Sequence, residues 1–225
     1  HWMAVADEIR QGRCRVRGLV LSMYLFRGSD ETDTAAVKAI ATAIRRDGNL
    51  KGLFLQSERG FSNEAGVALA EALTVNTNLR VVCLVCLTDT GYLDRAVIGA
   101  SAYEAFGAML RVNTNLSLEL PPFVNAIGDE RRLDHYNQMR IEQRLNSAGR
   151  GTLLSVVHSP REEWVNALHE LNTSSANESP AFHISCLYSL LRLNPNVCSS
   201  QVVKPTNRVI RKILAAKRMR RAWPW

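Results

Sequence analysis

The sequence predicts an α/β solenoid in which short parallel strands line the inside, helices cover the outside, and a helical cap closes the C-terminal end. A template close to L-x-x-L-x-L starts at residues 16, 50, 79 and 116, which gives intervals of 34, 29 and 37 residues. Between these starts, apolar residues recur at the spacing of an amphipathic helix. A unit of this size cannot bury its apolar face alone, so recurring units of about 20 to 50 residues are typical of stacked repeat proteins.

The template segments are predicted to be the strands. They are residues 16–21 (VRGLVL), 50–55 (LKGLFL), 79–84 (LRVVCL) and 116–120 (LSLEL), the last being one residue shorter. Successive side chains of a strand point to opposite faces. The template leucines are therefore expected to face the helices, and the residues between them to face away from the core.

Each predicted helix carries one apolar face, and small residues are expected to let neighbouring elements approach closely. Gly66 and Ala70 in particular should allow the second helix to pack against its strand and the next helix. The three apolar faces are Val37, Ile40, Ala41 and Ile44; Ala65, Leu69, Ala70 and Leu73; and Ala102, Phe106, Met109 and Leu110.

An Asn-Leu pair stands where each of the last three strands begins, at residues 49–50, 78–79 and 115–116. There a helix must end and the chain must reverse within a few residues. Asn tolerates the left-handed backbone conformation that ends many helices, and glycine adopts it still more readily. We therefore expect left-handed residues at these corners, including Gly48.

These strands and corners, together with the helical segment GVALAEAL at residues 66–73, resemble the ribonuclease-inhibitor-like class of leucine-rich repeats. The resemblance covers roughly residues 14–123. It implies a curved array with the strands on its concave face. We expect the chain to be a non-enzymatic module that binds a protein partner on that face. GTPase activators and actin-capping proteins of the tropomodulin type share this repeat architecture, so regulation of a GTPase or of an actin filament is the alternative.

Two departures from the family pattern concern the loops that follow the strands. Members of the class place Asn or Cys there to bond the loop backbone, whereas this chain has Tyr24, Glu58 and Leu87. Two intervals also exceed the usual length of the repeat. The loops near residues 30–33 and 92–99 should therefore bulge along one edge.

Beyond residue 124 the leucine template stops and helical patterns follow. Helices are predicted over residues 129–145, after the turn Ser159-Pro160, and after Ser179-Pro180. In the last of these, Ile184, Leu187, Tyr188 and Leu191 should form the apolar stripe. The predicted organisation is repeats over 1–123, in three to four units, a helical cap or a small separate helical domain over 124–201, and a basic tail over 202–225.

The strand residues that face away from the helices are the candidate binding residues. Apolar side chains there should be exposed to water, which favours either a protein partner or a further chain segment that covers them. Val20, Phe54, Cys83 and Val85 should make an apolar row. The full candidate set is Val20, Ser22, Phe54, Gln56, Val81, Cys83 and Val85.

The net charge of +7 resides in the C-terminal tail. Residues 202–225 contain eight of the 28 basic residues and no acidic ones, which leaves 20 basic against 21 acidic residues elsewhere. The tail is amphipathic and could bind an anionic membrane, a nucleic acid or a protein groove, or remain a solvated terminus. Its candidate residues are Arg208, Arg211, Lys212, Lys217, Arg218, Arg220 and Arg221.

No motif in the chain predicts catalysis, a cofactor or a small-molecule substrate. Cys83 and Cys86 have the spacing of zinc ligands, but they fall in a predicted strand and no second pair completes a site, so no metal is predicted. Five scattered cysteines indicate a reducing compartment. The charged N-terminus argues against an export signal, which favours a cytoplasmic protein, with a nuclear one as the alternative. Two residues precede the first methionine, Met3, which leaves open whether repeats lie upstream.

Overall fold

The computed structural model describes residues 2–22, 30–57, 60–86, 98–120, 130–155, 161–172 and 179–193. The chain divides into two compact parts, His1–Asn146 and Ser147–Trp225. The basic tail and the loop residues Tyr24, Glu58 and Leu87 lie outside the described residues, as do the loop at 92–97 and the turn at Ser159.

The first part contains a parallel sheet whose four strands follow one another in chain order. The strands are β1 (Gly18–Ser22), β2 (Gly52–Ser57), β3 (Val81–Cys86) and β4 (Ser117–Glu119). Each pairs in parallel with the next one. The prediction of an α/β protein with a parallel sheet is therefore confirmed.

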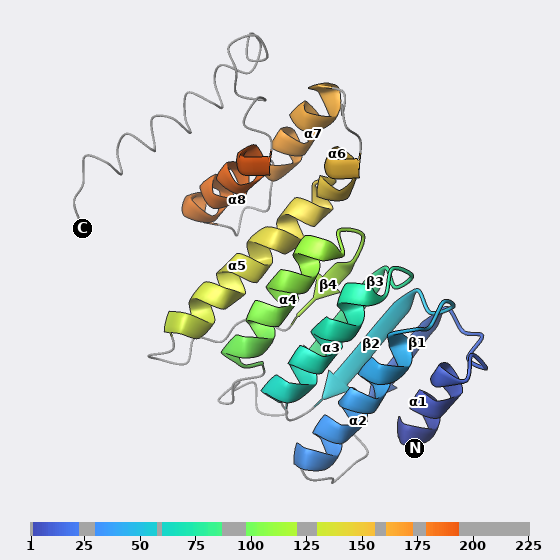
Figure 1. The fold of residues 1–225 in the computed structure, drawn as a ribbon. Coiled ribbons are helices and arrows are strands. Elements are labelled where there is room, and N and C mark those ends of the chain that lie inside the picture. Colours follow the sequence, from blue (N-terminus) through green and yellow to red (C-terminus); the bar gives the residue numbers. More distant parts are fainter. Residues whose placement is uncertain are drawn as a thin grey trace. The chain divides into compact units, whose positions relative to one another are not determined.

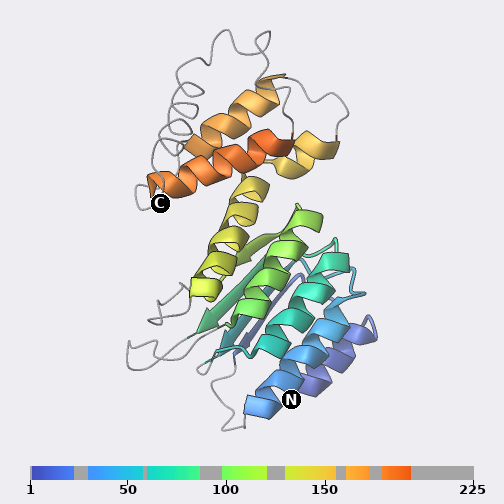
Figure 2. The same ribbon diagram turned by 60° about the vertical axis from the view of Figure 1, so that its left-hand side comes forward.

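A helix precedes each strand, and α1 to α4 lie side by side on one face of the sheet (Figures 1 and 2). The helices of this part are α1 (Trp2–Arg10), α2 (Asp30–Ile44), α3 (Asn63–Val75), α4 (Ala100–Val112) and α5 (Glu130–Ser147). Helix α1 has no counterpart among the elements predicted from the sequence. It ends at Arg10, and Gly12, two residues later, has a left-handed φ of 66°.

The core lies between the helices and the sheet. All twelve residues predicted to form the apolar helix faces are buried. From the sheet, Leu53, Leu55, Val82, Leu84 and Leu118 point into the same core and are at most 2% exposed. Burying side chains of this size stabilises the fold by roughly 1.5–3 kcal/mol each.

Gly66 sets the approach of α3 to α4, as predicted for a small residue. A Cβ atom at this position would lie 2.5 Å from the Cβ of Ala102. Gly107, one helix further on, is less restricted, because the nearest atom to an added Cβ would be the Cα of Met139 at 3.6 Å.

The corners between helices and strands correct one prediction. Among the described residues no residue other than glycine has a positive φ, and Gly48 is not among the positive-φ glycines. Asn76 has φ −83° and Asn113 has φ −92°. The expectation of left-handed corners is therefore wrong, and the asparagines act through their side chains.

Asn76 and Asn113 are buried, and their amides join each corner to the one before it. The Asn76 amide nitrogen donates to the carbonyl oxygens of Ile44 and Asp47, the latter at 3.1 Å. Its side-chain oxygen accepts from the backbone N–H groups of Asn78 at 2.8 Å and Leu79 at 2.9 Å.

The two donated hydrogen bonds recur at the next corner and in the last turn of α5. The Asn113 amide donates to the carbonyl oxygens of Leu73 and Asn76, both at 2.8 Å. Asn146 donates to those of Leu110 at 2.9 Å and Asn113 at 3.3 Å. We call Asn76, Asn113 and Asn146 the amide ladder. It satisfies helix-end carbonyls that would otherwise lack partners.

The first corner differs from the later ones. Val16, at the start of the first template segment, is 48% exposed, whereas Leu50, Leu79 and Leu116 at the equivalent positions are at most 2% exposed. In the second corner Asp47 takes the place of the asparagine. Its carboxylate accepts from the backbone N–H groups of Asn49 and Leu50 and has no hydrogen to donate backward.

Helix α5 belongs to the first part, although the sequence placed it beyond the repeats. Met139 lies in the core, and Gln143 donates a side-chain hydrogen bond to the carbonyl oxygen of Leu118 in β4. The division at 146/147 and the boundary predicted at 123/124 thus differ mainly by this helix.

The second part contains α6 (Arg150–Ser155), α7 (Arg161–Asn172) and α8 (Pro180–Leu193). The Ser179 hydroxyl accepts from the Phe182 N–H at 3.3 Å, so this residue caps α8 as predicted. The stripe predicted on α8 is only partly right, because Tyr188 is 49% exposed. The residues that α8 buries are Cys186, Leu187 and Leu190.

Candidate binding face of the sheet

The side of the sheet that points away from the helices carries the residues predicted for binding. Strand register brings them into three rows, one at each alternate position along the strands. We call this surface the open face. Its rows are Gly18, Gly52, Val81 and Ser117; then Val20, Phe54, Cys83 and Glu119; then Ser22, Gln56 and Val85.

The apolar residues of the open face differ in exposure. Val20 is 70% exposed and Val81 is 44% exposed, whereas Phe54, Cys83 and Val85 are half-buried. Val20, Phe54 and Cys83 share the middle row, but Val85 belongs to the next one. The predicted single apolar row is therefore a patch that spans two rows.

Two polar residues border this patch. Gln56 is half-buried in the third row. Ser22 lies beside it, and its hydroxyl oxygen is buried without a hydrogen-bond partner among the described atoms. Such a group usually finds a partner in water or in a bound molecule.

Glu119 ends the middle row and was not among the candidate residues. Its register partner is Cys83, and the two side chains are hydrogen-bonded. Burial, followed by the hydrogen bond and the negative charge of Glu119, raises the pKa of the Cys83 thiol from 9.0 to about 11. The thiol is thus protonated at neutral pH and is a poor nucleophile. The alternation in LSLEL could have indicated Glu119, since it places this residue on the outer face.

The metal hypothesis for Cys83 and Cys86 receives no support from the part of the chain that is described. No group of three or more His, Cys, Asp or Glu side chains that could hold a metal occurs there. The side chain of Cys86 and all seven candidate residues of the basic tail lie outside the described residues.

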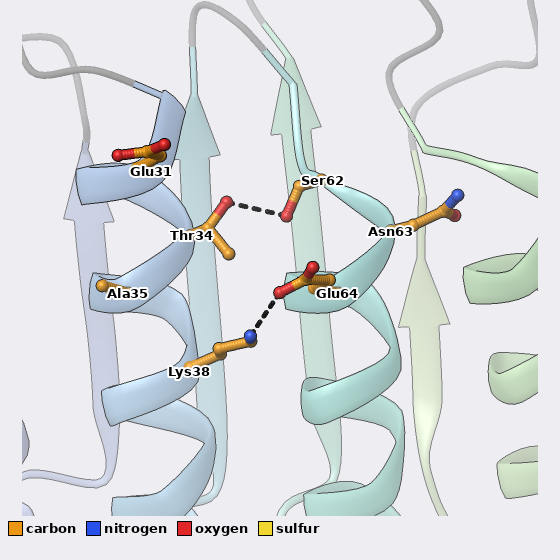
Figure 3. Close-up of a pocket in the computed structure, with 7 residues that line it drawn as sticks. All are labelled: Glu31, Thr34, Ala35, Lys38, Ser62, Asn63 and Glu64. Atoms are coloured by element: carbon orange, nitrogen blue, oxygen red, sulfur yellow. Dashed lines mark hydrogen bonds and ion pairs between the residues drawn. The ribbon is translucent and has the colours of Figure 1, made fainter.

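A second surface feature lies at the edge of the sheet where the strands end and the following helices begin. Figure 3 shows a pocket of about 500 Å³ between the N-terminal ends of α2 and α3. Thr34 donates to the Ser62 hydroxyl at 2.8 Å, and Lys38 forms an ion pair with Glu64 at 2.5 Å (Figure 3). Most polar side chains that line the pocket are thus hydrogen-bonded or ion-paired with one another.

None of the described helices is both long enough and apolar enough to span a membrane. No protein-family model matches the sequence, and no curated protein matches it.

Proposed function

We propose that this chain is a non-enzymatic interaction module, a short ribonuclease-inhibitor-like leucine-rich-repeat solenoid that binds a protein partner on its open face. Three features support the solenoid. The first three strands pair at the same template position, the helix faces bury equivalent residues, and the amide ladder repeats one pair of donated hydrogen bonds. This regularity is what stacked repeats require.

The observation that carries the binding role is the exposure of Val20 beside Phe54. An apolar side chain that is 70% exposed, in register with an aromatic ring, gains free energy when a partner removes it from water. Fully burying such a side chain contributes roughly 1.5–3 kcal/mol. A stable interface covers about 800 Å² on each partner, so the flanking polar residues must also be contacted.

The polar flanks would orient the partner. Glu119 provides a negative charge at one end of the middle row, and Gln56 and Ser22 provide hydrogen-bonding groups beside it. Ser22 is especially suited to this role because its oxygen is buried and has no hydrogen-bond partner among the described residues. A hydrogen-bond donor of the partner that reached the Ser22 oxygen would remove the free-energy cost of burying this oxygen without a donor.

The test compares Val20→Asp with Leu154→Asp, which places the same charge at a 51% exposed apolar position on α6, far along the chain from the open face. The full chain is immobilised, and proteins captured from a cell extract are quantified by mass spectrometry. Proteins retained by the wild type and by the Leu154 variant should be lost from the Val20 variant.

Circular dichroism and thermal unfolding should be unchanged in both variants, because both positions are exposed. The proposal is wrong if the Val20 variant captures the same proteins as the wild type, or if the Leu154 variant loses the same proteins.

A further inference from the structure

A row of positive charges lies along the edge of the sheet where helices end and strands begin. We call this the corner edge, comprising segments 11–17, 45–51, 76–80 and 113–116. Arg17, Lys51 and Arg80 each precede the first residue of a strand. Backbone hydrogen bonds join them in sequence, since Lys51 N–H donates to Arg17 O at 2.7 Å and Arg80 N–H donates to Lys51 O at 2.8 Å. We call these three residues the cationic row.

All three side chains of the cationic row are exposed, and none forms an ion pair with a described carboxylate. The nearest polar partner of the Lys51 ammonium is the uncharged Asn78 side chain at 3.5 Å. Neighbouring strands are about 4.8 Å apart, so the row places like charges on adjacent strands. Such pairs are unfavourable in the isolated protein.

The surrounding acidic groups are already engaged. The corner segments contain four further arginines, at positions 13, 15, 45 and 46, and Asp47 as their acidic residue. Asp47 is 6% exposed and accepts two backbone N–H groups. Glu8, just before the first segment, is paired with Arg13 at 2.5 Å. The edge therefore carries a positive charge that the described residues leave uncompensated.

Stabilisation of helix ends accounts for part of this charge but not for the cationic row. Arg45 and Arg46 directly follow α2, where cations interact favourably with the helix dipole. The dipole acts mainly within the last turn, whereas Arg17, Lys51 and Arg80 stand at the starts of strands. An external anion would give the row a favourable partner.

Apolar side chains are exposed in the corner edge and at the residues directly beside its segments. Val16 is 48% exposed, Val75 at the end of α3 is 50%, Val81 at the start of β3 is 44%, and Val112 at the end of α4 is 65%. The corner segments contain no aromatic residue, although aromatic stacking contributes much of the affinity for single-stranded nucleic acids. Mixed cationic and aliphatic groups fit the headgroup region of a lipid bilayer better.

We propose that the corner edge binds the surface of an anionic membrane, with the cationic row against lipid headgroups and the exposed valines against the adjacent apolar region. This surface is formed by described residues and includes no residue of the basic tail. It shares Val81 with the open face but does not depend on a protein partner there.

The test is co-sedimentation of the full chain with vesicles of phosphatidylcholine, alone or with about 30% phosphatidylserine. Arg17→Gln/Lys51→Gln/Arg80→Gln should weaken binding to the anionic vesicles by roughly 10- to 100-fold, since each cation near such a surface contributes substantially. Arg17→Gln alone should weaken it several-fold. Lys38→Gln/Arg131→Gln/Arg192→Gln removes the same charge from exposed positions elsewhere and should change binding by less than about twofold.

Every variant retains the basic tail. A difference in vesicle affinity between the two triple variants therefore shows that the position of the removed charges matters. Equal binding by the two variants would overturn the proposal. It would also be overturned if the row variant bound anionic vesicles normally but lost binding to a fluorescent 20-residue poly(U) RNA, which would assign the row to nucleic acid. Replacing Val75 and Val112 by Ser should weaken vesicle binding further, and an unchanged affinity would remove the valines from the interface.

Discussion

The two edges of the sheet are built differently. Asn76 and Asn113 at the corner edge, and Asn146 in the last turn of α5, each donate the same pair of hydrogen bonds to the preceding layer of the fold. At the opposite edge, the starts of α3 and α4 are capped in different ways. The Ser62 side chain caps α3 by accepting from the Ala65 N–H at 3.2 Å, whereas Gly99, before α4, has no side-chain cap bond of its own.

At this second junction a neighbouring helix supplies the missing cap. The Asn63 side chain accepts from the Ala102 N–H at 3.4 Å, and it occupies the space that a Cβ at Gly99 would need. The comparison teaches that the regular corner edge maintains the stacking of the strands. The opposite edge needs only local caps, so its connections can vary in length and sequence.

Asn76→Ala should have the largest effect on stability among the substitutions considered for these edges. It removes two bonds to backbone carbonyls, one at the end of α2 and one in the corner that follows, and leaves two backbone N–H groups without their acceptor. We expect the free energy of unfolding to fall by about 3 kcal/mol.

Urea denaturation measures this change, and Asn78→Ala is the matched control. Asn78 is only part-buried and its side chain makes a long contact with Lys51, so its loss should cost less than about 1 kcal/mol. Similar losses for the two variants would contradict the special role of the amide ladder.

Gly66→Ala should have an intermediate effect and probes the half of α3 near the opposite edge. The added methyl group would collide with Ala102, so α3 and α4 must separate, at a cost of about 1–3 kcal/mol. Gly107→Ala adds the same group where the nearest atom is 3.6 Å away. It should be neutral or slightly stabilising, because alanine favours helix. This account would be contradicted if the Gly66→Ala variant had a higher midpoint of thermal unfolding than the Gly107→Ala variant.

Glu64→Gln should have the smallest effect. The hydrogen bond from Lys38 lowers the pKa of the Glu64 carboxyl below its ordinary 4.5. A lowered pKa means that the pair stabilises the fold above the ordinary value and loses this contribution as the pH falls through the lowered one. Because the pair is exposed, we expect equal denaturation midpoints for the variant and the wild type at pH 7. A clear loss of stability would show that the opposite edge depends on side-chain pairs.

The sequence predicted the features that follow from periodicity. Template residues such as Leu53 and Leu84 are buried, and their outward neighbours Phe54 and Cys83 lie in one row. Burial at a period of two or 3.6 residues follows from the local order of apolar and polar residues. It can therefore be predicted without knowing which elements pack against the segment.

The features that the sequence missed depend on partners distant along the chain. The sequence predicted only a local backbone role for asparagines at the corners, but Asn76 bonds residues 29 and 32 positions earlier. Glu119 gained its significance from Cys83 across the sheet. On α8, helical spacing suggested Tyr188 for the buried stripe, while packing buries Cys186 and Leu190 instead. Spacing alone cannot choose between two overlapping faces of a helix that is apolar on most sides.

The direction of the amide ladder bears on how the protein is made. Each asparagine donates to carbonyl groups that leave the ribosome before it does, as Asn113 does to Leu73 and Asn76. A nascent chain can therefore complete each layer on a finished predecessor, without waiting for residues still to be synthesised. We infer that this part of the protein assembles progressively from its N-terminal end during translation.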